Sequence, residues 1–351
     1  MVKCGVIGCG VIAPTHIAGI KAVTNAELIA LCDIDPERLN KRGDEHNIDS
    51  SKRYTDYHDL LADKEIDLVH ICTDHASHCQ IVVDALNAGK HVICEKSSGR
   101  VDADLEAMAN AAKAHPELVS SGIFQHRFVK QNCALKELVE NNKFGKMVLV
   151  NLSFCCKRTN EYYQADAWRG TMAGEGGGIL INQAIHHLDQ LRFIFGDIDY
   201  VTAASGNLTH QGVIEVEDTA VFTMEFASGV LGSVSATNSS NTRWRSSLIC
   251  SGTEATLEFA NETPIYVDAA DEALKSELET LLAPPAKEER IVGKSYYGSG
   301  HTAQIADVVD SIENKRAPKV SLIEAINSSS LIMAVYESAR NNGARTAVRK
   351  Y

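Results

Sequence analysis

The first third of the chain alternates short apolar runs with stretches in which apolar residues recur every three or four positions. The apolar runs lie at residues 2–7, 27–32, 67–72, 91–96 and 118–124. Strands that alternate with helices in this way form a parallel sheet with helices on both of its faces. We therefore expect an α/β domain over residues 1–123.

After residue 123 the pattern changes to long strand-like runs in succession. These runs lie at residues 144–154, 200–208, 217–239 and 245–260. Successive strands predict a second, α+β domain over residues 124–351. Every second residue from Ala220 to Phe226 is apolar, while the residues between them are only partly polar. A sheet face of this kind favours a homo-oligomer, either a homodimer or a homotetramer, and a solvated face is the alternative.

Composition narrows the classes of partner. The 351 residues include 34 Lys plus Arg against 46 Asp plus Glu, and the resulting net charge of −12 disfavours broad binding to nucleic acid. No run approaches the roughly 18 apolar residues of a membrane helix, and the sequence opens on a strand-like run rather than a signal peptide. The 10 cysteines form no CxxC pair, which suits reduced thiols. We expect a cytoplasmic protein without a nucleic-acid or membrane partner.

A glycine-rich turn follows the first apolar run. Gly8 permits a tight turn from strand to helix, Gly10 lets a pyrophosphate approach the backbone, and Val11 and Ile12 lead into the helix N-terminus that binds it. Asp33 ends the second strand, where its carboxylate can accept hydrogen bonds from a ribose and repel a 2′-phosphate. The sequence thus predicts NAD as the cofactor, with NADP less favoured. The structural alternative for Asp33 is a cap on the next helix.

Further candidates follow the other strands. Ligands of open α/β sheets bind beyond the carboxyl ends of the strands, where this sequence places Thr73, Glu95, Lys96 and Gln125. We expect these residues to border the cofactor. The Lys96 ammonium would also stabilise a developing alkoxide, and a solvated lysine is the alternative.

One cluster offers zinc-type ligands. Its spacing is Cys72-x-x-His75-x-x-His78-Cys79. Zinc sites usually draw on two separated pairs of ligands, so we favour a loop that lines the cofactor groove, with His78 beside the cofactor, over a metal site.

The richest segment runs from Trp168 to Gly196. A run of glycines precedes a helix with an apolar stripe, and at about 100° per residue Asn182, His186 and Asp189 share a separate face of that helix. An amide and a carboxylate beside His186 could fix its tautomer and tune its pKa toward neutrality, as a general base requires. A surface helix with a hydrogen-bonded histidine is the alternative.

Taken in order, these motifs resemble the glucose–fructose oxidoreductase/inositol dehydrogenase/MocA family. The resemblance extends over essentially the whole chain, including QHRF at 125–128, FGK at 144–146 and the ending AVYESARNNG. It implies an N-terminal Rossmann domain and a C-terminal α+β domain with a large, mostly antiparallel open sheet. The implied activity is nicotinamide-dependent oxidation or reduction of a sugar or cyclitol carbinol.

The resemblance also implies roles for individual residues. Lys96 matches the lysine of the family's Glu-Lys-Pro motif, and His186 matches its catalytic histidine. We expect catalysis by Lys96 and His186, in a cleft between the domains, with either of the two as the base. We expect substrate contacts from Asn182, Asp189, Trp168, Arg169 and Tyr297, and His301 is a weaker candidate for the same pocket. A tryptophan buried in the core is the alternative for Trp168.

Three departures from the family pattern stand out. Ser97 replaces the usual proline after Lys96, and Asp74-His75 replace the common Pro-Asn after Thr73. Asn182 replaces the aspartate of inositol-type members and resembles the branch that acts on nucleotide sugars and glycosides, often at the pyranose C3.

The expected function is hydride transfer between NAD and a secondary carbinol of a sugar, glycoside or nucleotide sugar. Two other functions stay open. One is a redox-neutral cleavage of glycosides with tightly held NAD, and the other is a non-catalytic sensor of NAD and sugar.

Overall fold

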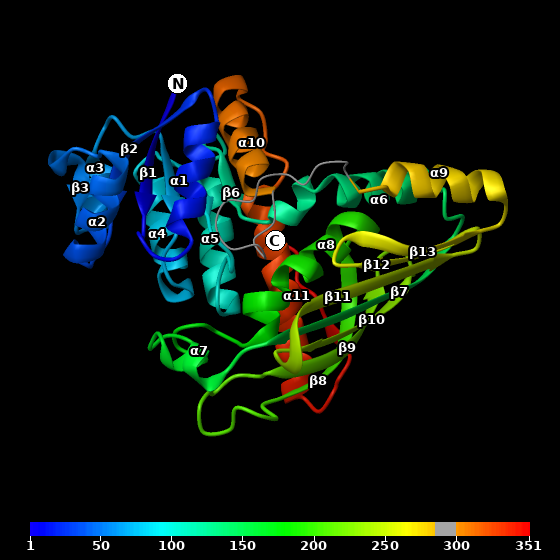
Figure 1. Cartoon of the computed structure of the whole chain (residues 1–351). Coiled ribbons are helices and arrows are strands. Elements are labelled where there is room, and N and C mark those ends of the chain that lie inside the picture. The colour runs from blue at the N-terminus through cyan, green and yellow to red at the C-terminus, as the bar shows by residue number, and fades with distance from the viewer. Residues whose placement is uncertain (285–299) are drawn as a thin grey trace. The chain divides into compact units, whose positions relative to one another are not determined.

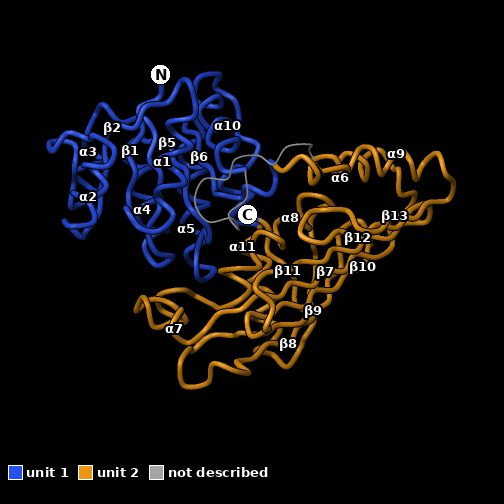
Figure 2. Tube along the Cα trace, in the orientation of Figure 1, with its two compact units in different colours: residues 1–128, 289–327, 351 blue, residues 129–288, 328–350 orange. Residues whose placement is uncertain are grey.

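The computed structural model describes residues 1–284 and 300–351. The described chain forms two compact units (Figures 1 and 2). Unit 1 comprises residues 1–128, 300–327 and 351, and unit 2 comprises residues 129–284 and 328–350. No helix in the described ranges is long and apolar enough to cross a membrane.

Unit 1 is built on a six-stranded parallel sheet with the strand order β3-β2-β1-β4-β5-β6. The strands are β1 (Val2–Ile7), β2 (Ala26–Cys32), β3 (Arg53–Tyr54), β4 (Leu68–Ile71), β5 (His91–Cys94) and β6 (Ser120–Gly122). The helical elements are α1 (Ala13–Ala22), α2 (Pro36–His46), η1 (Ser50–Lys52), α3 (Tyr57–Ala62), α4 (His75–Asn87), α5 (Asp102–Ala114), η2 (Gln125–Phe128) and α10 (Gly300–Asn314). This strand order is that of a Rossmann fold, in which a dinucleotide binds where the order reverses, between β1 and β4.

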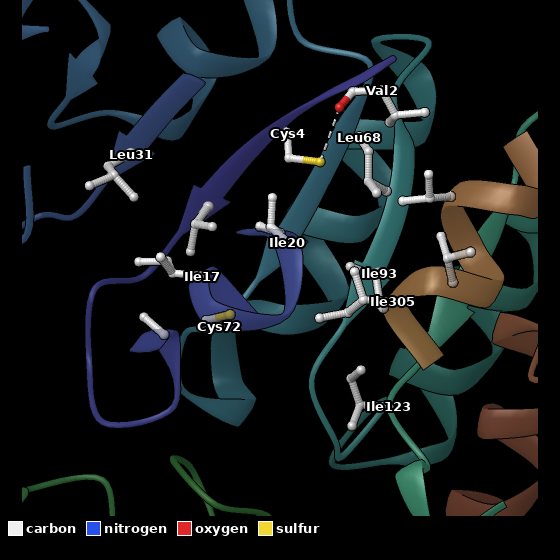
Figure 3. Packing of buried hydrophobic residues seen from close by; sticks show 14 of the residues in the cluster. Val2, Cys4, Ile17, Ile20, Leu31, Leu68, Cys72, Ile93, Ile123 and Ile305 are labelled. Carbon is white, nitrogen blue, oxygen red and sulfur yellow. Dashed lines mark hydrogen bonds between the residues drawn. The ribbon is translucent and has the colours of Figure 1, made fainter. Parts of the chain in front are cut away.

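Helix α10 belongs to the core of unit 1. Its residues Ile305 and Val308 are fully buried in one cluster with Ile17 and Ile20 of α1 (Figure 3). The two helices approach so closely that a Cβ on Gly19 would lie 2.4 Å from Ile305 Cδ1. The sequence division at residue 123 assigned this helix to the second domain, because an apolar stripe does not indicate which core it enters. That division stays a prediction.

Unit 2 is built on an eight-stranded sheet with the order β13-β12-β11-β7-β10-β9-β8-β14. Only β7 and β10 pair in parallel among the described strands of this sheet. The strands are β7 (Met147–Lys157), β8 (Ile198–Gly206), β9 (Thr219–Phe226), β10 (Leu231–Thr237), β11 (Ser239–Gly252), β12 (Ala255–Ala260), β13 (Thr263–Ala269) and β14 (Thr346–Ala347). The predicted large, mostly antiparallel sheet is confirmed.

One face of this sheet is buried and the other is exposed. Phe222 and Met224 of β9 are 3% and 1% exposed, whereas Val221 between them is 52% exposed. The helical elements of the unit are α6 (Lys130–Glu140), α7 (Asn160–Gln164), η3 (Leu180–Ala184), α8 (Ile185–Phe195), α9 (Glu272–Leu282) and α11 (Leu322–Arg340), the last from Ser328 onward. Helices α8 and α11 cover the buried face (Figure 1).

Candidate functional site

The turn after β1 has the geometry of a dinucleotide cradle. Gly8 has a φ of 94°, and a Cβ at this position would lie 2.7 Å from the backbone C and O atoms of Cys72. A Cβ on Gly10 would meet nothing within 4 Å, so the space beside Gly10 is open. Helix α1 starts after Ile12, and no side chain of the described residues caps it. An open approach to an uncapped helix N-terminus fits a pyrophosphate.

Asp33 holds this turn in place. It is 5% exposed, its Oδ2 accepts a hydrogen bond from the Cys9 backbone N–H at 2.7 Å, and its Oδ1 accepts one from Asp35 at 2.9 Å. The cap of α2 is Asp35 and not Asp33, so the structural alternative for Asp33 is wrong. The guanidinium of Arg38 lies 3.7 Å from Asp33 Oδ2. The carboxylate of Asp33 therefore lies beside the glycine turn, where the NAD prediction requires it.

His78 ties together the loops that follow β4 and β5. Its ring is fully buried, with Nδ1 at 2.8 Å from the carbonyl oxygen of Ser97 and Nε2 at 3.2 Å from that of Thr73. Thr73 itself is partly exposed, and Asp74 caps α4 by accepting from the Ser77 N–H. His78 thereby sets the shape of both loops. Residues 1–284 and 300–351 contain no group of three or more side chains arranged to hold a metal ion.

Buried histidines surround the carboxylate that precedes Lys96. Glu95 Oε1 accepts a hydrogen bond from His16 Nε2 at 2.9 Å and lies 3.6 Å from His301 Nε2. Burial alone would raise the pKa of Glu95, but the hydrogen bonds and charges of the two histidines hold it well below its usual range. His16 Nδ1 lies 3.0 Å from His70 Nδ1, and burial holds the pKa of His70 well below normal. Glu95 is thus an ionised, fixed anchor for the segment that carries Lys96.

Lys96 is only partly buried, and its backbone N–H donates to Glu95 Oε2 at 3.2 Å. Ser97 is fully buried, and its hydroxyl donates to the Gly99 carbonyl oxygen at 2.6 Å. The Lys96–Ser97 peptide bond is cis. Lys96 is thus partly exposed between two buried neighbours, Glu95 and Ser97.

In unit 2, Asn182 lies in a polar cluster with two of the predicted substrate residues. Its Nδ2 donates to the buried carboxylate of Glu175 and, at 3.3 Å, to the Tyr162 hydroxyl. Arg169 Nη1 donates to the same hydroxyl at 2.7 Å, and the guanidinium lies 4.5 Å from the centre of the Trp168 ring. The structure therefore brings Asn182, Trp168 and Arg169 together.

The helix that carries Asn182 and His186 does not have uniform α geometry. Residues Leu180–Ala184 form the π-helical turn η3, and α8 continues from Ile185. His186 is partly buried, while Asp189 is fully buried and accepts from the Ser328 hydroxyl of α11 at 2.6 Å. Asp189 thus faces α11 while Asn182 faces Tyr162, unlike the shared face expected at 100° per residue. The wider π turn, with hydrogen bonds from i to i+5, changes that angular spacing.

The remaining candidates are Gln125, Tyr297 and His301. Gln125 is 2% exposed and opens η2, and a Cβ on Gly300 would lie 2.0 Å from its carbonyl oxygen. Tyr297 lies outside the described residues. His301 Nε2 lies 3.6 Å from Glu95 Oε1 in unit 1.

Three buried groups escaped the sequence analysis: His16, Glu175 and Glu217. His16 lies in a helix whose pattern gives no reason to single it out, and Glu217 lies in the segment before β9, two residues from its first residue, Thr219. Glu175 interrupts the glycine run, and that interruption was the one local signal available.

Two family models match this chain. Residues 2–123 match the model of an oxidoreductase family with an NAD-binding Rossmann fold, and residues 133–258 match that of the GFO/IDH/MocA C-terminal domain. The uncharacterized oxidoreductase YrbE of Bacillus subtilis is 30% identical over 277 residues, which span 77% of this chain and 78% of YrbE. Myo-inositol 2-dehydrogenase of Thermotoga maritima is 31% identical over 66% of each chain.

Solved structures with a similar fold also include dehydrogenases. The WlbA dehydrogenase of Bordetella pertussis, crystallised with NADH and UDP-GlcNAcA, superposes with a TM-score of 0.87 at 25% identity and covers 100% of this chain and 98% of its own. These findings confirm the predicted fold class, the NAD cofactor and the oxidoreductase class. The chain belongs to the GFO/IDH/MocA family of oxidoreductases.

Proposed function

We propose that this protein transfers hydride between NAD and a secondary carbinol of a sugar, glycoside, nucleotide sugar or cyclitol. One observation carries the proposal: a single chain combines a cradle that fits a dinucleotide with a helix that presents Asn182 and His186. Among its relatives are a myo-inositol 2-dehydrogenase and a dehydrogenase crystallised with a nucleotide sugar, which support a polyhydroxylated substrate.

The residues of unit 1 would hold the cofactor. Gly8, Gly10, Val11 and Ile12 would receive the pyrophosphate, and Asp33 would accept hydrogen bonds from the adenosine ribose. Bound NAD⁺ would accept the hydride from the carbinol carbon. Asp33 disfavours NADP because its carboxylate repels a 2′-phosphate.

Thr73, Glu95 and Gln125 would border the cofactor. The buried His78 would support cofactor binding by fixing the shape of the loop that carries Thr73. Glu95 would contribute by fixing the backbone of Lys96, since its own carboxylate is engaged by histidines.

Lys96 and His186 would carry the proton chemistry. His186 takes the hydroxyl proton as hydride leaves, while the Lys96 ammonium holds the oxygen and stabilises its negative charge. The reverse assignment, with Lys96 as the base, uses the same two groups. Asn182 would hold a neighbouring hydroxyl, and the Trp168 ring, with Arg169 stacked on it, would pack against the C–H groups of a sugar.

The test is to incubate the purified protein with NAD⁺ and a panel of free sugars, cyclitols, aryl glycosides and nucleotide sugars. We expect NADH to accumulate in step with a carbonyl product for one of these groups. Glycoside cleavage without accumulating NADH would instead establish the redox-neutral reaction. Binding of NAD and sugar without any turnover would establish a sensor and refute the proposal.

The exposed face of the unit 2 sheet would meet a second copy of the chain. Leu231 of β10 lies between Leu149 of β7 and Glu225 of β9, and Leu231, Leu149 and Val221 are all exposed. We propose that this face forms the interface of a homodimer or homotetramer, since two such sheets can pack face to face. Sedimentation of a monomer at micromolar concentration would refute this.

A further inference from the structure

A buried carboxylate from a distant part of the chain holds the start of the helix that carries Asn182 and His186. Glu217 Oε2 accepts from the Gly178 N–H at 2.8 Å, and Oε1 accepts from the Leu180 N–H at 3.0 Å. The backbone carbonyl of Glu217 accepts from the Ile179 N–H at 3.1 Å. One residue thus engages three successive amides at a helix N-terminus, where negative charge is favoured by the helix dipole.

The glycines before this helix make room for that contact. A Cβ on Gly178 would lie 1.8 Å from the Glu217 carbonyl oxygen, and a Cβ on Gly177 would lie 2.0 Å from the Tyr336 hydroxyl. Tyr336 in turn donates to Glu217 Oε1 at 2.9 Å. The glycine run therefore makes room for Tyr336 of α11 and for Glu217, which lies two residues before β9, beside the start of the helix.

This arrangement costs stability at neutral pH. Burial raises the pKa of Glu217 to about 7, although the N–H groups of Leu180 and Gly178 and the Tyr336 hydroxyl act to lower it. Because the folded-state pKa exceeds the usual value near 4.5, the stability contributed by this group is present below about pH 4.5 and is lost as pH rises through about 7. A neutral side chain would avoid that cost.

Other titratable groups lie near the Glu217 carboxylate. The Tyr336 hydroxyl faces Glu217 from α11, with a pKa raised well above normal by burial and by the Glu217 charge. The buried carboxylate of Glu175 accepts a hydrogen bond from Asn182, and its negative charge also raises the pKa of Tyr336. Asp218, the next residue, is satisfied separately by His210 and the backbone amides of Leu208 and Thr209.

We propose that Glu217, supported by Tyr336, is a positioning residue for the reaction, which holds the start of the helix so that Asn182 and His186 are placed for substrate. The proposal rests on the proposed function, in which those two residues act on the carbinol. The charge is needed because an ionised carboxylate accepts at once from the Gly178 and Leu180 N–H groups and from the Tyr336 hydroxyl. A carboxamide has one acceptor oxygen and would point an N–H group at one of the helix amides.

The experiment compares Glu217→Gln with Glu215→Gln. Glu215 is exposed two residues earlier, and it accepts from the Met172 N–H rather than from the helix, so it is a matched control. Hydrogen–deuterium exchange of residues 178–186 reports on the helix start without any substrate. We expect faster exchange there in Glu217→Gln and a kcat at least about tenfold lower, with NAD affinity within about twofold of wild type. Glu215→Gln should match wild type in all three.

Tyr336→Phe provides a second, milder perturbation. Loss of its hydroxyl removes a bond to the ionised carboxylate, so the pKa of Glu217 should rise. The pH below which residues 178–186 lose protection from exchange should therefore move to a higher value. If Glu217→Gln does not fold, Tyr336→Phe tests whether Glu217 is a positioning residue.

Unchanged exchange and kcat in Glu217→Gln, or an unchanged pH dependence of exchange at residues 178–186 in Tyr336→Phe, would overturn the proposal. Faster exchange in Glu217→Gln combined with normal turnover in His186→Ala would leave Glu217 as a helix clamp but refute the proposed function.

Discussion

Replacing each of two glycines in the same turn by alanine should have different effects, on stability at Gly8 and on NAD binding at Gly10. Gly8 has a positive φ and its missing Cβ would collide with the backbone of Cys72, whereas the missing Cβ of Gly10 points into open space. Gly8→Ala should therefore damage the fold. Gly10→Ala should damage only the binding of NAD.

The magnitudes follow from what each methyl group displaces. A methyl at Gly10 would keep the pyrophosphate from the backbone and remove about one hydrogen bond to a charged group, worth about 1.5–3 kcal/mol, or about tenfold to a hundredfold in affinity. The left-handed conformation alone costs alanine at Gly8 about 1–2 kcal/mol. In a unit of this size that lowers the melting temperature by about 2–8 °C, and the 2.7 Å contact with Cys72 adds to it.

Titration calorimetry with NAD⁺ and thermal unfolding of the cofactor-free protein separate the two effects. We expect Gly10→Ala to unfold within about 1 °C of wild type but to bind NAD⁺ at least about tenfold more weakly. Wild-type affinity in Gly10→Ala would show that the pyrophosphate does not approach this backbone. An equal loss of stability in both variants would show that the space beside Gly10 is not open.

Three further predictions concern other parts of the molecule. Glu95→Gln should destabilise unit 1 by about 3 kcal/mol, because it removes the carboxylate from buried histidines. Since the pKa of Glu95 is lowered by folding, its contribution is present above about pH 4.5 and is lost in acid, so the variant should show a flatter pH dependence of the melting temperature. Leu231→Lys should shift the sedimentation coefficient toward that of the monomer, whereas wild-type sedimentation would place the interface elsewhere. Asp33→Asn should narrow the ratio of NAD⁺ to NADP⁺ affinity by at least about tenfold in calorimetry, and an unchanged ratio would remove Asp33 from cofactor discrimination.

The parts of the fold that local sequence determines were predictable. Strands buried on both faces need continuous apolar runs, and the turn at Gly8 needs a residue that tolerates positive φ, so both appear directly in the sequence. The alternation from Ala220 to Phe226 indicated a strand with one apolar face, but the strand-like run expected over residues 217–239 is divided into the antiparallel strands β9 and β10, with Gly229 at positive φ between them.

What depends on distant contacts was not predictable. The helix of Ile305 and Val308 has an ordinary apolar stripe, and only tertiary packing decides that it joins α1. Glu217 lies 37 residues from the amide of Leu180 that it holds, so no local pattern links the two. The regular 100° spacing used for the sequence does not describe the π turn at Leu180–Ala184, and Asn182 and Asp189 contact different elements, Tyr162 and α11.

The most direct test of the mechanism is the turnover of Lys96→Ala, His186→Ala and the double variant on the substrate that the panel identifies. If both residues act in one step, each single change should lower kcat by at least about a hundredfold, with NAD binding retained. The kcat of the double variant should then be close to that of the less active single variant. Near-normal turnover in either single variant, or losses that simply multiply in the double variant, would contradict the account.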